Sequence, residues 1–152
     1  MTATVSDPAP ILPERAASPT ELSILNHPDQ RTTWTVVMTA TLDDRDPDLP
    51  DLVASRLRAL ADQAPILRAR WRGGRWHQDT PPRPAIVPGD PLAAAELLQR
   101  FDLSREPPVR LVIAAEGSRL ALAAHHAALD GRGMLAVLAA VLGTPAPDTP
   151  FP

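Results

Sequence analysis

Residues 119–131, RLALAAHHAALDG, contain the change of sequence pattern that decides the fold. The apolar run that ends at His126 is typical of a buried strand, in which successive side chains point to opposite faces of a sheet. Gly131 allows the backbone to bend sharply, and the apolar stretch after it predicts a helix that ends at Gly143. The pattern therefore predicts a strand leading directly into a helix, with His125 and His126 at the junction.

Outward from this junction, the chain alternates between helical and strand patterns. In the first half of the chain we expect a helix at 18–25 capped by Ser18 or Thr20, a strand at 33–42, a helix at 48–63 and a strand at 66–71. A hairpin turn at Gly73-Gly74 and a loop at 79–89 follow. In the second half we expect a helix at 90–101, strands at 109–115 and 120–126, and the final helix. Helices interleaved with a mixed sheet indicate the α/β class, specifically a two-layer sandwich.

The composition excludes several classes of site. The chain has 152 residues, which fits one domain, and its hydrophobic fraction of 44% is enough for a core. A formal net charge of -3 gives no electrostatic reason to expect nucleic acid or an anionic membrane as a partner. The absence of cysteine excludes a disulfide, a thiolate metal site and a cysteine nucleophile.

The two ends of the sequence differ in composition from its middle. Residues 1–17 and 144–152 are rich in Pro and Ala, and we expect them to be flexible tails on a folded lobe at 18–143. No signal peptide fits the first residues, and the apolar stretch at 133–142 is too short to cross a bilayer. We therefore expect a cytoplasmic protein without a membrane span.

The histidine pair is the strongest candidate for chemistry. A neutral imidazole is the natural general base near pH 7. Because neighbours on a strand face opposite ways, one histidine can face a cleft while the other is packed. Asp130 lies four residues after His126, and a buried acid needs a partner. We expect Asp130 to contact Arg68, the best cationic candidate, or a neighbouring backbone amide. The alternative is that both histidines are ordinary surface or satisfied residues at a strand end.

Other residues with polar or aromatic side chains carry less weight. His27 and His77 fit exposed loop positions. The three tryptophans, Trp34, Trp71 and Trp76, fit the core or a sheet face better than a stacking platform for a ligand.

Three stretches, in this order, carry a resemblance to a known family. They are PILR at 65–68, FDLSREPPVR at 101–110 and HHAALDG at 125–131. These resemble the LR segment, the FDLS-x-x-P-L-x-R segment and the HHxxxDG signature of the condensation domains of nonribosomal peptide synthetases. Relatives of that family include chloramphenicol acetyltransferases, polyketide-associated acyltransferases and wax ester synthases. The resemblance covers roughly 18–143 and implies a single chloramphenicol-acetyltransferase-like lobe, the N-terminal one.

The resemblance implies a role for each residue that matches a family motif. His126 matches the residue that acts as the base or positions the acceptor, while His125 and Asp130 match mainly structural residues. Gly131 matches the glycine beside the reacting thioester, and Arg68 matches the arginine that pairs with the signature aspartate. The implied acyl donor is a phosphopantetheine thioester, on an acyl carrier protein or on coenzyme A. No metal and no bound cofactor is implied.

Two departures from the family keep other functions open. Gly133 stands where peptide-forming members usually have Ser. Family enzymes are pseudodimers with the substrate tunnel between two lobes, whereas this sequence matches one lobe. The chain is therefore expected to need a second lobe or a second copy of itself. The alternative is a non-catalytic truncated lobe that acts as an interaction module for a carrier protein or partner enzyme.

Overall fold

Two sheets and three helices form the part of the chain that the structure, a computed structural model, describes: residues 14–29 and 31–145. The helices are α1 (Pro19–Leu25), α2 (Leu49–Gln63) and α3 (Gly131–Leu142), with 3-10 turns η1 (Pro65–Arg68), η2 (Pro91–Ala93) and η3 (Ala95–Leu98). The strands are β1 (Arg15–Ala16), β2 (Thr35–Thr41), β3 (Ala69–Arg72), β4 (Arg75–Gln78), β5 (Ala85–Val87), β6 (Val109–Ala114) and β7 (Arg119–His125).

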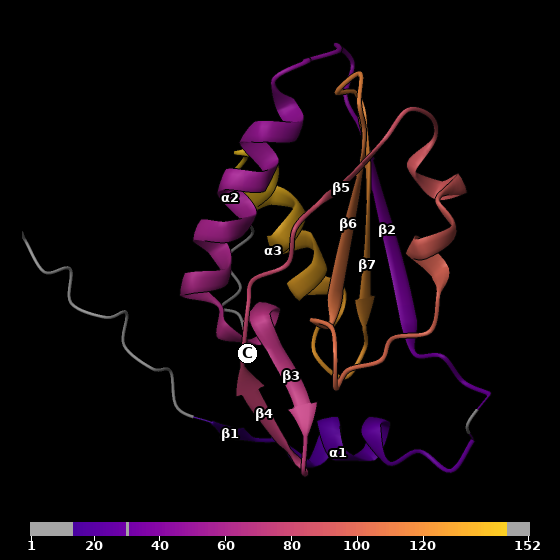
Figure 1. Cartoon of the computed structure of the whole chain (residues 1–152), viewed down its shortest axis with the longest axis vertical. Coiled ribbons are helices and arrows are strands. Elements are labelled where there is room, and N and C mark those ends of the chain that lie inside the picture. Colours follow the sequence, from indigo (N-terminus) through magenta and orange to yellow (C-terminus); the bar gives the residue numbers. More distant parts are fainter. Residues whose placement is uncertain (1–13, 30, 146–152) are drawn as a thin grey trace, which may run out of the picture.

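The larger sheet has the strand order β2-β7-β6-β5. Its pairs are antiparallel except for β5 and β6, which run parallel, so the sheet is mixed. The helices α2 and α3 pack against each other and cover one face, while the segment with η2 and η3 lies along the other side (Figure 1). The predicted α/β class and layered architecture are confirmed.

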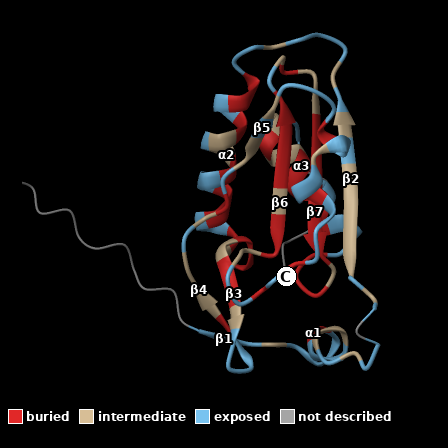
Figure 2. Cartoon of the chain, turned by 45° about the vertical axis from the view of Figure 1, so that its right-hand side comes forward, coloured by how far each residue is buried: buried red, intermediate tan, exposed pale blue. Residues whose placement is uncertain are grey.

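Strand β7 is central because both of its neighbours pair with it along nearly its whole length. Thr35 of β2 lies opposite His125, and Met38 lies opposite Leu122. Residues 120–125 are all buried, so both faces of the strand are covered (Figure 2). This explains why the sequence shows a continuous apolar run here instead of an alternation of apolar and polar residues.

The hairpin at Gly73-Gly74 forms as predicted, but its strands belong to a second sheet with the order β1-β4-β3. Trp76 of β4 is fully buried and belongs to the same hydrophobic cluster as the helices and the larger sheet. The turn η1 contacts both α2 and β4. The two sheets therefore share one core.

Three predicted elements differ from the structure. The strand expected at 66–71 begins at Ala69, because Pro65 starts a 3-10 turn that occupies the first half. The helix expected at 90–101 is replaced by η2 and η3, which are separated at Ala94, where the backbone is extended. The loop expected at 79–89 contains β5, which is a strand because β6 supplies its hydrogen-bonding partner.

Part of the expected N-terminal tail is a strand. Arg15 and Ala16 form β1 and pair with β4. Arg15 also ion-pairs with the buried Glu21, with 2.7 Å between Nη2 and Oε1. Ser18 caps α1 in a reciprocal capping box with Glu21. The folded lobe thus includes residues before 18, while most of the two predicted tails, 1–13 and 146–152, lies outside the described residues.

Candidate active site

The junction between β7 and α3 has the predicted form of strand, short turn and helix. Asp130 is the N-cap of α3, and its Oδ1 accepts a hydrogen bond from the Gly133 amide at 2.8 Å. A Cβ at Gly133 would lie only 3.0 Å from Leu129 Cδ2, so the turn leaves little room for a side chain. The backbone of the HHAALDG stretch is therefore fixed by a helix cap and by close packing.

His126 follows the last residue of β7 and is half-buried. Its amide donates to the Trp34 carbonyl at 2.8 Å, which holds the backbone against the start of β2. Its Nδ1 lies 3.3 Å from the carbonyl oxygen of Leu129. A carbonyl oxygen can only accept, so the neutral ring carries its proton on Nδ1 and its lone pair on Nε2. This is the tautomer that a base acting through Nε2 requires.

His125 has the opposite arrangement. Its side chain is 9% exposed, and its Nδ1 accepts a hydrogen bond from the Ala127 amide at 3.1 Å. The neutral ring therefore carries its proton on Nε2. Burial, together with the nearby positive charges of His126 and Arg100, lowers the pKa of His125 to about 4. His125 is thus a neutral hydrogen-bond donor at physiological pH.

The pairing of Arg68 with Asp130, which the family resemblance implied, is not formed. Arg68 Nη1 ion-pairs with Asp62 at 3.0 Å, and its Nε donates to the Asp79 carbonyl at 2.8 Å. Asp130 is exposed and accepts from a backbone amide, which is the other contact that we expected for it. The physical reason is that Arg68 ends a 3-10 turn that contacts α2, so its side chain reaches Asp62 near the end of that helix. The structure therefore separates Arg68 from the histidine junction.

Trp34 is a residue whose place beside the histidines the sequence did not predict. Its φ of 53° places a bulky residue in the left-handed region, where strain is stored. Its ring stacks on His126, with centroids 6.3 Å apart and planes at 14°, and meets His27 edge-on at 5.2 Å. Its position within the strand expected at 33–42 predicted a role in the core or on a sheet face. Only the backbone conformation reveals that Trp34 is held beside the candidate base.

A cavity of about 510 Å³ opens on the His125 face of β7, and we call it the His125 cavity. Its walls come from α1, the loop before β2, Trp71 of β3 and the FDLS segment, and its lining residues are Ile24, Leu25, His27, Asp29, Thr32, Thr33, Trp34, Trp71, Arg100, Phe101, Asp102, Leu103, Ser104 and His125. His126 is not among them. Of the two histidines, His125 is therefore the one that lines this cavity.

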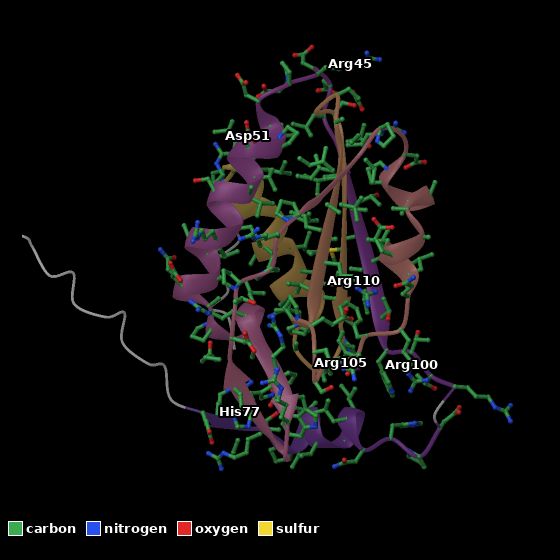
Figure 3. All side chains as sticks on the ribbon, viewed as in Figure 1. Arg45, Asp51, His77, Arg100, Arg105 and Arg110 are labelled. Atoms are coloured by element: carbon green, nitrogen blue, oxygen red, sulfur yellow. The ribbon has the colours of Figure 1, made fainter. Side chains whose placement is uncertain are left out.

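Arg110 of β6 holds the FDLS segment against this cavity. Its guanidinium lies 3.9 Å from the centroid of the Phe101 ring, ion-pairs with Glu106 and donates to backbone carbonyls of residues 97, 99 and 100. The Phe101 ring in turn meets His125 edge-on, with centroids 6.1 Å apart. Figure 3 shows Arg100, Arg105 and Arg110 near the end of the sheet at which β7 ends.

Within the described part of the chain, no group of three or more His, Cys, Asp or Glu side chains is placed to hold a metal ion. Among the same residues, no helix has both the length and the apolar character needed to cross a bilayer.

Comparison with protein-family models and with curated proteins finds no match to this chain. Comparison with solved structures does find similar folds. The starter condensation domain of rhizomide synthetase RzmA, in a product-released conformation, matches with a TM-score of 0.63 and 17% identity over 90% of this chain and 38% of that one. The same starter domain has also been solved in complex with C8-CoA and Leu-SNAC.

Two further solved structures show the same relationship. The X-domain in complex with OxyB, from teicoplanin biosynthesis, matches with a TM-score of 0.58 and 23% identity over 97% of this chain and 36% of that one. The tallysomycin biosynthesis protein TlmII matches with a TM-score of 0.57 and 20% identity over 86% and 39%. The chain spans less than two fifths of these relatives' lengths. Its fold is that of part of a condensation domain.

Proposed function

We propose that this chain is a lobe of a condensation-type acyltransferase, which transfers an acyl group from a phosphopantetheine thioester to an amine or an alcohol. The observation that carries the proposal is the 3.3 Å contact between His126 Nδ1 and the Leu129 carbonyl oxygen. A ring that donates to this carbonyl from Nδ1 has its Nε2 lone pair left for proton abstraction. The likeness in fold to solved condensation domains, and the HHAALDG sequence itself, support the choice of reaction class.

In the proposed reaction, the amine or hydroxyl of the acceptor attacks the carbonyl carbon of the thioester. His126 Nε2 removes the proton from the attacking nitrogen or oxygen. The carbon–sulfur bond then breaks, and the leaving thiolate receives the proton from the imidazolium. The acyl donor in this proposal is an acyl carrier protein or acyl-CoA, and neither a metal nor a bound cofactor takes part.

The proposal includes a second lobe that completes the site. The chain covers only 36% to 39% of the length of three solved structures that share its fold, and this partial coverage supports the proposal. Leu92 on η2 and Leu98 on η3 are 48% and 61% exposed, and both turns contact β7. Large exposed apolar side chains beside the central strand suit a surface that another lobe covers.

The test is an acyl-transfer assay with octanoyl-CoA and a panel of amines and alcohols, run with the full chain alone and with any second lobe encoded beside it. His126→Ala should lower the rate by about a hundred- to ten-thousand-fold, the usual contribution of a general base. His77→Ala is the matched control, because His77 lies on the small sheet, and its rate should equal that of the wild type. Turnover by the His126→Ala chain at the wild-type rate would show that His126 is not the base.

The second candidate function is a non-catalytic interaction module for a carrier protein or a partner enzyme. The observation that favours it is that the candidate base, His126, does not line the His125 cavity. The solved X-domain, which shares this fold, forms a complex with OxyB. If the wild-type chain transfers no acyl group with any donor or lobe, this second function becomes the better description.

A further inference from the structure

The His125 cavity has a feature that the acyl-transfer proposal does not use: an unpartnered donor on a buried side chain. His125 Nδ1 is occupied by the Ala127 amide, so the proton lies on Nε2. This N–H has no hydrogen-bond partner among the described residues, and the side chain, only 9% exposed, lines the cavity. His125 Nε2 is not among the fully buried polar atoms that lack a partner, so it is accessible from the cavity, where an acceptor atom of a bound molecule can reach it.

The remaining walls define the rest of that molecule. Trp34, Trp71 and Phe101 supply three aromatic surfaces, and Ile24 and Leu25 of α1 add aliphatic ones. A volume of about 510 Å³ lies in the range of sites for small organic molecules. Such walls favour a flat apolar body over a strongly hydrated one.

The two carboxylates that line the cavity, Asp29 and Asp102, do not favour a charged molecule. Asp29 already accepts hydrogen bonds from the Arg31 amide and the Thr32 hydroxyl. Asp102 accepts from both the amide and the hydroxyl of Ser104. These carboxylates are engaged in their own turns, and His125 is neutral. Arg100 also lines the cavity, but it is exposed, so the buried part of the wall holds no charged side chain that would compensate a buried charge.

We propose that the His125 cavity binds a small uncharged molecule, whose apolar body lies against Trp34, Trp71 and Phe101 and whose carbonyl oxygen accepts a hydrogen bond from His125 Nε2. His126 does not line this site. This binding goes beyond the acyl-transfer proposal, because it requires neither the base nor a second lobe. Trp34 belongs to both places, since it lines the cavity and stacks on His126, so binding should also alter the surroundings of the candidate base.

The test is a titration of the isotope-labelled full chain with two probes of the same shape, followed by NMR of amide, indole and imidazole groups. Acetophenone carries a carbonyl, and α-methylstyrene replaces that oxygen with a methylene group. Both should shift the indole N–H signals of Trp34 and Trp71 and leave the Gly117 turn, at the other end of the sheet, unchanged. Acetophenone should bind about fivefold more tightly, the usual effect of one hydrogen bond.

Two pairs of variants locate the site. Ile24→Trp places a large ring in the cavity and should weaken acetophenone binding at least tenfold, while Leu22→Trp, on the same helix but outside the lining, should not. His125→Phe should remove the preference for acetophenone over α-methylstyrene. If that variant does not fold, the Ile24 and Leu22 pair still decides the matter.

Three results would overturn the proposal: no binding of either probe, binding unaffected by Ile24→Trp, or equal affinity of the wild type for both probes. Neither probe is a thioester and no second lobe is present in the titration. Failure of this test therefore leaves the acyl-transfer proposal standing, and failure of the transfer assay leaves the cavity proposal standing.

Discussion

At the scale of single residues, the buried imidazole of His125 gives the fold a dependence on pH. Its pKa falls from 6.5 to about 4 on folding, so between these values the unfolded chain binds a proton that the folded chain does not. The stabilisation is fully present above about pH 6.5 and is lost as the pH falls toward 4. We expect the free energy of unfolding in urea to decrease by on the order of 3 kcal/mol over this range.

Two histidine variants assign this pH dependence. His125→Gln keeps a polar side chain that does not titrate, so the decrease between about pH 6.5 and pH 4 should disappear. His77→Gln, on the small sheet, should retain it. Equal slopes for the two variants would mean that the dependence arises elsewhere in the chain.

Successive side chains of a strand point to opposite faces, and this was enough to predict that the two histidines face opposite sides. It was not enough to predict the hydrogen bonds of each ring. Their tautomers depend on backbone partners, the Leu129 carbonyl and the Ala127 amide, which only the turn after the strand brings into place. The prediction that Arg68 pairs with Asp130 was wrong because Arg68 lies in a 3-10 turn and not in a strand, which changes the direction of its side chain. Sequence spacing therefore located the site but not its hydrogen bonds.

At the scale of elements, the turn between β6 and β7 depends on Gly117. Its φ is 79°, and a Cβ there would lie 1.7 Å from the Asp46 carbonyl oxygen. That clash is with backbone, so the loop before α2 would have to move. Gly117→Ala should therefore lower the free energy of unfolding by more than about 2 kcal/mol, measured by urea denaturation.

Gly74 is the matched control for Gly117. Its φ is 75°, but nothing lies within 4 Å of its missing Cβ. Gly74→Ala should cost only the strain of a left-handed alanine, about 1 kcal/mol. If both variants lose the same stability, the close approach to Asp46 does not matter and conformation alone sets the cost.

Elements with strong local patterns were predicted well, and the others were not. The helices α2 and α3 follow clear helical spacing of apolar residues, and their ends agree closely with the expected ones. By contrast, β5 exists because β6 pairs with it, and the helix expected at 90–101 breaks at the extended backbone of Ala94. Tertiary contacts decided these two segments, and a single sequence does not contain them.

At the scale of the whole molecule, the predicted α/β lobe is correct, but the division of its strands into two sheets was not foreseen. The hairpin of β3 and β4 could have joined the larger sheet by its strand pattern alone. Instead, the Trp71 amide donates to the Leu103 carbonyl at 2.7 Å, and Arg72 Nε donates to the Ser104 carbonyl at 2.7 Å. The FDLS segment thus occupies the edge of β3.

Because the two sheets share one core, we expect the described part of the chain to unfold in one cooperative step. Tryptophan emission reports largely on the small sheet, where Trp71 and Trp76 lie, and the sequence has no tyrosine to obscure it. Far-ultraviolet ellipticity reports on α2 and α3. The two urea midpoints should coincide, and Leu67→Ala, which removes a fully buried side chain of η1, should lower both equally, by about 2–5 kcal/mol of stability. A fluorescence transition that precedes the loss of ellipticity would instead mean that the small sheet, and with it the wall of the His125 cavity, opens independently of the strand that carries the histidines.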